Sequence, residues 1–355
     1  EIQAFRELAQ AEKRPFLYRN HRPENPPIWD GSMPLRLKSE PKSYTRRDAV
    51  MGDLTTGPEV IDDIILIKSD GYPTYNFAHI IDDAEMKITH IIRGQEFLSS
   101  IPNYLNIYEA LDLESPIMAT MPHIMAPDGK KKLGKRDGAK DVLDYIRDGF
   151  LPETMLNFIA SLGWNDGTEQ EIFSVQELIA KFSLDRVQRS GARFDERRLL
   201  WMNGAHIRAL SIDSLYERTS GYWPEESIDY DDDYKKRVLG LIQERLKFFA
   251  EIPDLPINPE LISSNKQLSK IETDELKNLL EKANTALQDS DFTVENLSNK
   301  LNELLEITGQ KPGILFSLIR ISTTQAPFSP SLAETLSVLG KERSLNRLNA
   351  QIQQL

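Results

Sequence analysis

Short apolar runs alternate with helical patterns in the first third of the chain. Residues 64–67 form a β-branched run closed by an aspartate–glycine pair, which is typical of a buried strand followed by a turn. Residues 88–92 form a second run, which ends at Arg93 and Gly94 and leads into apolar residues at helical spacing. A third apolar stretch, 117–124, is followed by a Pro-Asp-Gly turn. This alternation predicts an α/β layer with parallel strand pairing.

The apolar pattern becomes helical from about residue 140 onward. Residues 276–287 and 297–305 place leucines at the i, i+3/i+4 and i+7 positions of an amphipathic helix. Residues 15–45 contain many prolines, which excludes long helices there because proline fixes φ and lacks a backbone donor. Residues 2–9 have the spacing of the middle of a helix, so we expect the chain to be cut at its N-terminus.

Composition narrows the class of protein. The length of 355 residues suggests two or three domains. The absence of cysteine excludes disulfide frameworks, thiolate zinc sites and cysteine nucleophiles, and it fits a reducing, cytoplasmic location. No apolar run approaches the roughly 20 residues that span a bilayer, so we expect no membrane partner. The net charge of −12 argues, taken alone, against a protein that coats nucleic acid non-specifically.

The positive charge is nevertheless concentrated in two clusters. The first follows the Pro-Asp-Gly turn and consists of Lys130, Lys131, Lys132, Lys135 and Arg136. The second consists of Arg186, Arg189, Arg193, Arg197 and Arg198. Helical spacing would place four of these arginines on one face, although Gly191 makes a continuous helix doubtful. Focused charge creates a strong local field whatever the total charge, while the alternative for a lysine run is a solvated loop without a ligand.

The loop at residues 129–139 has two chemical interpretations. Gly129, Gly134 and Lys135 fit the phosphate-binding pattern G-x-x-x-x-G-K, but Arg136 stands where that pattern needs Ser or Thr to hold magnesium. We therefore reject the P-loop. In the other interpretation, the lysine side chains of a mobile loop meet a polyphosphate and neutralise charge that builds in the transition state.

The same loop resembles the KMSKS-type signature of class I aminoacyl-tRNA synthetases, in the K-L-S-K-R form of bacterial glutamyl-tRNA synthetases. Residues 132–136 read K-L-G-K-R, with Gly134 in place of the serine. Further family-like blocks occur in the family's order, and together they cover the chain from about residue 50 to its end. They are D-G-Y-P-T-Y-N-F-A at 70–78, I-T-H-I-I-R-G at 88–94, L-G-W at 162–164, W-M-N-G at 201–204 and L-G-K-E-R at 339–343.

The resemblance implies an α/β fold followed by an all-α fold. It implies the C-terminal half of a Rossmann-like class I catalytic domain, then a helical stem-contact domain and an all-α anticodon-binding domain. The expected ranges are 1–66 for the remainder of the connective, acceptor-binding insertion, 67–125 for the half Rossmann-like domain, 126–208 for the stem-contact domain with the K-L-G-K-R loop, and 209–355 for the anticodon-binding domain.

The resemblance also implies a reaction and its residues. ATP, as Mg-ATP, and glutamate would form glutamyl-adenylate, and the glutamyl group would pass to tRNA(Glu). The implied catalytic residues are Lys135, Lys132 and Arg136. The implied glutamate-binding residues are Arg93, Tyr75 and His79. The alternative for Arg93 is a structural ion pair, that for Tyr75 is core packing, and that for His79 is a structural role. The implied ATP-binding residues are Lys135, Glu96 and Phe97. We assign the tRNA backbone to Arg186, Arg189, Arg193 and Arg197, and we expect a monomer without zinc or another protein-held metal.

The sequence departs from the family at its start. Gln95 stands where the family usually has glutamate, and none of the five histidines forms the H-x-G-H pair of the class I nucleotide fold. We therefore expect an N-terminally truncated chain that does not form adenylate efficiently by itself. The alternative function is a non-catalytic, tRNA-binding module derived from a synthetase.

Overall fold

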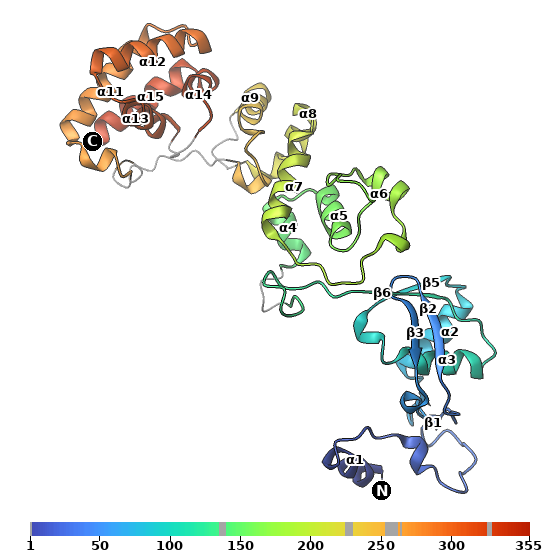
Figure 1. The fold of residues 1–355 in the computed structure, drawn as a ribbon. Helices are drawn as coiled ribbons and strands as arrows, with labels where there is room; N and C mark the ends of the chain where they lie inside the picture. Colours follow the sequence, from blue (N-terminus) through green and yellow to red (C-terminus); the bar gives the residue numbers. More distant parts are fainter. Residues whose placement is uncertain (1, 135–139, 224–229, 253–261, 263–264, 325–328) are drawn as a thin grey trace. The chain divides into compact units, whose positions relative to one another are not determined.

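The chain divides into two compact units, which are described separately. The computed structural model describes residues 2–134, 140–223, 230–252, 262, 265–324 and 329–355 (Figure 1). The first unit comprises Glu1–Ala139 with Leu156–Asp195, and the second comprises Lys140–Met155 with Glu196–Leu355. None of the described helices is long and apolar enough to cross a membrane.

The N-terminal part of the first unit contains little regular structure. Its elements are α1 (Ile2–Ala11), a 3-10 helix (Tyr18–His21), β1 (Leu35–Arg36), a second 3-10 helix (Pro58–Val60) and β4 (Ile65–Ile67). β1 and β4 pair in antiparallel orientation. The predicted helix at residues 2–9 and the lack of long helices among the prolines of residues 15–45 are both confirmed.

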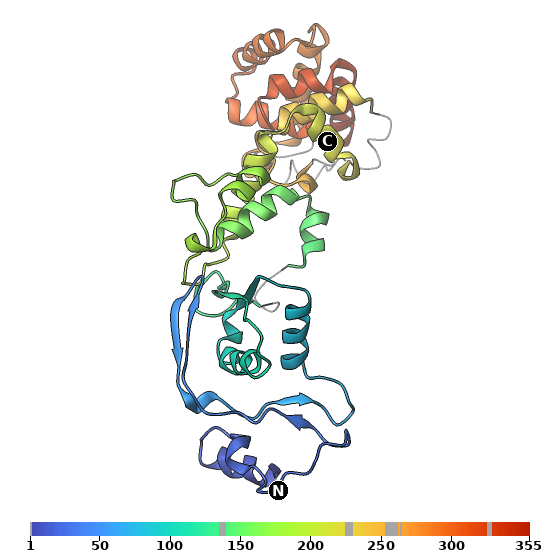
Figure 2. The same cartoon turned by 90° about the vertical axis from the view of Figure 1, so that its right-hand side faces the viewer.

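A β-hairpin that the sequence pattern did not indicate follows β1. Its strands are β2 (Tyr44–Asp48) and β3 (Gly52–Thr56), and their pairing runs from Tyr44 opposite Thr56 to Asp48 opposite Gly52. β2 also packs along β6, and Figure 2 shows the hairpin in blue.

A parallel strand pair forms the α/β layer of the first unit. The layer contains α2 (Tyr75–Glu85), β5 (His90–Gly94), a 3-10 helix (Gln95–Phe97), α3 (Ile101–Ala110) and β6 (Ile117–Met121). β5 and β6 pair in parallel, from His90 opposite Ile117 to Gly94 opposite Met121. This confirms the predicted strand–helix–strand order, whereas β4 pairs with β1 instead of joining these two strands. Apolar side chains of α2, α3 and β6, including Ile80, Ile107 and Met118, form the core.

The rest of the first unit packs on the hairpin turn and β6. It contains part of α5 (Pro152–Ser161), α6 (Val175–Lys181) and a 3-10 helix (Leu184–Arg186). Trp164, Phe173 and Leu178 share one apolar cluster with Val50 and Ala119. The hairpin, the β5–β6 layer and residues 156–195 therefore form one body.

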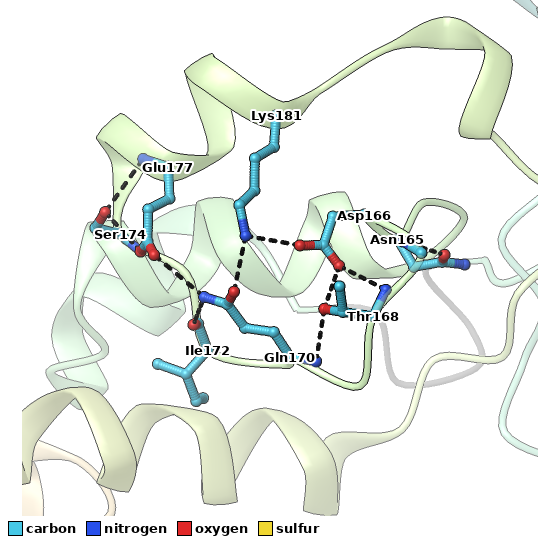
Figure 3. Close-up of polar contacts among 9 residues, drawn as sticks. Asn165, Asp166, Thr168, Gln170, Ile172, Ser174, Glu177 and Lys181 are labelled. Carbon is cyan, nitrogen blue, oxygen red and sulfur yellow. Dashed lines mark hydrogen bonds and ion pairs between the residues drawn. The ribbon is translucent and has the colours of Figure 1, made fainter.

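A polar network holds the loop at residues 165–173 against α6 (Figure 3). The Lys181 ammonium donates to Asp166 Oδ2 at 2.7 Å and to Gln170 Oε1 at 2.8 Å. The bonds from Lys181 and Thr168 lower the pKa of Asp166 to about 2. Ser174 and Glu177 form a capping box at the start of α6, and Gln170 donates to Glu177. The network fixes the turn that contains Gly167, on which Arg186 lies.

The described part of the second unit is all-α, as predicted. Its helices are α4 (Val142–Asp148), α7 (Glu196–Arg208), α8 (Ile212–Arg218), α9 (Asp232–Ile242), α11 (Thr273–Gln288), α12 (Val294–Thr308), α13 (Pro312–Thr324), α14 (Leu332–Leu339) and α15 (Lys341–Gln354), with 3-10 helices at Ser220–Tyr222, Phe249–Glu251 and Leu268–Lys270. The predicted helices at residues 276–287 and 297–305 are α11 and α12. Their leucines lie in one large core with α13, α14 and α15.

The boundaries of the two compact units differ from the expected domain boundaries. Residues 140–155 and 196–208 belong to the second unit, because Leu151 and Ile207 share a core with Leu215 and Leu239. The expected range 126–208 is thus divided between the units. The functions assigned to the four ranges stay predictions.

Candidate active site

A small cavity lies beside the parallel strands β5 and β6. It encloses about 20 Å³, which is room for about one water molecule. Its polar lining residues are His79, Arg93, Tyr104, Tyr108 and Thr120, and Phe97 contributes an aromatic wall. Arg93 and Thr120 are direct neighbours in the strand pairing, near the carboxyl ends of both strands. Parallel sheets bind ligands at this end.

Arg93 carries the positive charge of this cavity. Its guanidinium carbon lies 5.2 Å from the ring centre of Phe97 and 6.0 Å from that of Tyr75. Among the residues that the structure describes, Arg93 forms no ion pair with a carboxylate. The alternative for Arg93, a structural ion pair, therefore finds no carboxylate among the described residues. A half-buried guanidinium between aromatic rings suits an incoming carboxylate.

Tyr75 and His79 occupy the first turns of α2, next to Arg93. Their rings stack with centres 4.9 Å apart, and the edge of Tyr104 meets His79 at 4.7 Å. The Tyr75 carbonyl accepts from His79 Nδ1 at 2.8 Å, so a neutral His79 carries its proton on Nδ1 and leaves Nε2 as an acceptor. Tyr75 is 53% exposed, so core packing does not account for it.

Glu96 connects the end of β5 with the K-L-G-K-R loop. One of its oxygens accepts from Lys132 Nζ at 3.2 Å, and the other lies 3.7 Å from His123 Nδ1. Its own backbone N–H and the Lys132 ammonium lower the pKa of Glu96. Lys132, which the resemblance assigns to the nucleotide, is thus ion-paired with Glu96 in this structure. Lys135 and Arg136 lie outside the described residues, and no sequence pattern indicated His123.

The base of the loop belongs to a small three-stranded arrangement. Residues 124–126 pair with 131–133 on one side, through Leu133 N–H to the Ile124 carbonyl at 2.8 Å. They pair with 192–194 on the other side, through Met125 N–H to the Ala192 carbonyl at 2.8 Å. The segment with the arginine cluster is therefore attached directly to the base of the lysine-rich loop.

The arginine cluster does not occupy one helix face. A 3-10 helix ends at Arg186 and α7 begins at Glu196, so no continuous helix carries these arginines, as Gly191 had indicated. Arg197 lies in α7, in the second unit. The other three predicted tRNA contacts are exposed, and each packs on a glycine with positive φ. These pairs are Arg186 with Gly167 (φ 86°), Arg189 with Gly52 (φ 81°) and Arg193 with Gly129 (φ 70°).

Glycine suits these three turns because a positive φ is costly for other residues. An added Cβ would also meet the guanidinium group in each pair, but that group is the far end of a flexible side chain and can move aside. Arg189 also donates from Nε to the Val50 carbonyl at 3.1 Å, which ties it to the hairpin turn. Its replacement would therefore disturb the fold as well as the surface charge.

Asp48, at the end of β2, is a buried carboxylate that no sequence pattern indicated. It is 2% exposed. Its Oδ1 accepts from the backbone N–H groups of Val50, Met51 and Thr120 at 2.9–3.0 Å, and its Oδ2 accepts from the Thr120 hydroxyl at 2.6 Å and from Arg46 at 2.8 Å. Burial raises the pKa of Asp48, but the hydrogen bonds from Met51, Thr120 and Val50 outweigh it and lower the pKa to about 2.

These bonds predict a pH dependence of stability. Because the folded pKa is below the ordinary value of 3.8, the stabilisation is present above about pH 4 and is lost as the pH falls toward 2. It amounts to about 2 kcal/mol. Urea unfolding at several pH values should show Asp48→Asn less stable than wild type at pH 7 and less sensitive to acid between pH 4 and 2. Parallel stability curves for the two proteins would contradict this account of Asp48.

Comparisons with known proteins identify the family. Residues 18–201 match the family of class I tRNA synthetases (E and Q), catalytic domain, and residues 214–352 match an anticodon binding domain. The chain belongs to the class I tRNA synthetases (E and Q). It is 37% identical to the glutamate–tRNA ligase of Clostridium botulinum (strain Hall) over 100% of this chain and 76% of that protein. For the glutamate–tRNA ligase of Chlorobaculum parvum, the identity is also 37%, over 92% and 68% of the two chains.

Solved structures confirm the synthetase fold. The crystal structure of a glutamate tRNA ligase from Elizabethkingia meningosepticum, in complex with its amino acid, has a TM-score of 0.74 and 27% identity and covers 98% of this chain and 70% of that one. The glutamate–tRNA synthetase from Elizabethkingia anophelis has a TM-score of 0.75 and 28% identity, with the same coverage. The described residues include no group of three or more His, Asp or Glu side chains arranged to hold a metal ion.

Proposed function

We propose that this protein acts as a glutamate–tRNA ligase, which forms glutamyl-adenylate from ATP and glutamate and passes the glutamyl group to tRNA(Glu). The observation that carries the proposal is Arg93, a cation without an ion-pair partner among the described residues, which lies at the carboxyl end of a strand and lines a cavity of about 20 Å³. The identity to glutamate–tRNA ligases along the whole chain supports it. We further propose that the protein is a cytoplasmic monomer.

Arg93 would select the amino acid. Its planar fork can donate two parallel hydrogen bonds to the side-chain carboxylate of glutamate, whereas the amide of glutamine offers only one acceptor. His79 lines the same cavity and Tyr75 stacks on it, and the Nε2 of His79 can accept from the amino group of the substrate. These three residues would leave the α-carboxylate free to react.

The lysine-rich loop would serve the adenylation step. An oxygen of the α-carboxylate attacks the α-phosphorus of ATP, the bond to the bridging oxygen breaks, and pyrophosphate leaves. Lys132, Lys135 and Arg136 would neutralise the charge that develops on the phosphates, and Mg²⁺ would enter with the ATP phosphates. Glu96 and Phe97 would lie on the nucleotide side of Arg93. The assignment of Lys132 to the nucleotide is supported by its contact with Glu96, which is assigned to the same side.

The arginine cluster would contact the tRNA backbone. Phosphate neutralisation releases counterions, so log K falls as log salt rises. Each lost contact makes this negative slope less steep by about 0.7–0.9. We expect the double variant Arg186→Glu and Arg193→Glu to bind tRNA more weakly and to reduce the magnitude of this slope by about 1.5. Binding is measured over a series of salt concentrations. Lys87→Glu, which reverses an exposed charge just after α2, serves as the control. An unchanged slope in the double variant would mean that the cluster is only a solvated surface.

Glutamate-dependent exchange of pyrophosphate into ATP tests the proposed activity. Because this sequence by itself is not expected to form adenylate efficiently, the test uses the natural protein, that is, this sequence with any residues that accompany it in its source. Supplied with tRNA(Glu), the natural protein should support exchange with glutamate and much less with glutamine or aspartate. A protein that binds tRNA(Glu) but supports no exchange would be the non-catalytic, tRNA-binding alternative.

A further inference from the structure

The turn after β2 takes the place of a third strand beside β6. The Ala49 N–H donates to the Met118 carbonyl at 2.8 Å, as a neighbouring strand would. Two residues further along β6, the Thr120 N–H donates to Asp48 Oδ1 at 3.0 Å instead of to a backbone carbonyl. The Asp48 carboxylate thus completes the edge of β6 that faces away from β5.

Thr120 connects this carboxylate with the cavity. It is 1% exposed, and both its N–H and its hydroxyl donate to Asp48. In the strand pairing it is the direct neighbour of Arg93, and both residues line the cavity. A threonine whose hydroxyl is held in this way has one χ1 rotamer, so Asp48 determines the shape of the wall beside the guanidinium group.

We propose that Asp48 is a positioning residue for the amino acid pocket and that it acts through Thr120. The inference rests on the proposed function, in which Arg93 receives the glutamate carboxylate. Asp48 touches no substrate. It holds the β6 wall at the distance that lets Arg93 form two hydrogen bonds with that carboxylate, and Arg46 balances its charge at 2.8 Å.

Asp63 provides a matched control in the same unit. It is 3% exposed, accepts two hydrogen bonds from Arg22 at 2.6 and 2.7 Å and one from the Ser39 N–H at 2.8 Å, and does not line the cavity. Asp63→Asn should cost stability as Asp48→Asn does. If the only role of Asp48 were to hold the hairpin in place, Asp48→Asn and Asp63→Asn would also have the same effect on KM for glutamate.

The test uses variants that separate the two oxygens of Asp48. Asp48→Asn can keep one acceptor for the backbone N–H groups, but it turns a donor toward Arg46 and the Thr120 hydroxyl. Thr120→Val removes only the hydroxyl, and Thr120→Ser retains it. In pyrophosphate exchange by the natural protein with tRNA(Glu), we expect Asp48→Asn and Thr120→Val to raise KM for glutamate by about tenfold, because a misplaced wall weakens alignment. KM for ATP should stay unchanged, as should KM for glutamate in Thr120→Ser and Asp63→Asn.

Two results would overturn the inference. One is a wild-type KM for glutamate in the folded Thr120→Val protein. Thr120→Val is the milder variant, so it tests the Asp48–Thr120 contact even if Asp48→Asn fails to fold. The other is a parallel rise of both KM values, matched by Asp63→Asn. The Arg93→Ala variant distinguishes a failure of the proposed role of Asp48 from a failure of the proposed function. If Arg93→Ala leaves KM for glutamate unchanged, the pocket assignment itself is wrong.

Discussion

Arg93→Ala is expected to lower kcat/KM for glutamate by about 10³-fold, because truncating one member of a desolvated charge pair costs about 4 kcal/mol. Affinity for tRNA should not change, since the arginines assigned to the RNA backbone lie elsewhere in the chain. Arg93→Lys should recover only part of the loss. A lysine restores the charge but not the planar fork that binds both carboxylate oxygens.

Pyrophosphate exchange at varied glutamate concentration measures this effect. Arg147→Ala, which removes an exposed arginine from α4, is the control and should behave as wild type. A gain of activity with glutamine in Arg93→Ala would strengthen the role of Arg93 in selection. Wild-type kinetics in a folded Arg93→Ala protein would refute the pocket.

Lys135→Ala is expected to lower kcat for adenylate formation by about 10²- to 10³-fold while KM for glutamate stays near that of wild type. The reason is that a charge placed at the reacting phosphate stabilises the transition state more than the bound substrates. Lys135 lies outside the described residues, and this prediction comes from the K-L-G-K-R sequence and from the place of Lys132 beside Glu96.

A neighbouring lysine supplies the matched control for Lys135. Lys130 is an exposed member of the same basic run, before the K-L-G-K-R motif, and Lys130→Ala should retain nearly full kcat. Single-turnover rates of adenylate formation distinguish the two variants. Equal losses in both would mean that the run acts through its total charge and not through one positioned lysine.

Local periodicity predicted the elements whose apolar pattern is long or clear. The β5–α3–β6 order and the helices α11 and α12 follow from residues near one another in sequence. The hairpin at residues 44–56 escaped prediction because its strands are short and largely polar. Asp48 could not be recognised either, since its partner Thr120 lies 72 residues further along the chain.

The candidate site was predictable to the extent that single motifs define it. The resemblance assigned Arg93, Tyr75 and His79 to glutamate and Phe97 to ATP. Arg93, His79 and Phe97 line one cavity and Tyr75 does not, so these roles stay predictions. The second basic cluster shows the limit of such reasoning. Spacing left a helix face open, and Gly191 argued against it. In the structure Arg186, Arg189 and Arg193 each pack on a glycine from another loop. Those pairings depend on tertiary contacts that no local pattern encodes.

Charging of tRNA(Glu) with radiolabelled amino acids tests the central claim most directly. The natural protein should attach glutamate to tRNA(Glu) in an ATP-dependent reaction, and Arg93→Ala should abolish most of this charging while tRNA binding persists. Attachment of glutamine in preference to glutamate, or equal charging by wild type and Arg93→Ala, would contradict the account.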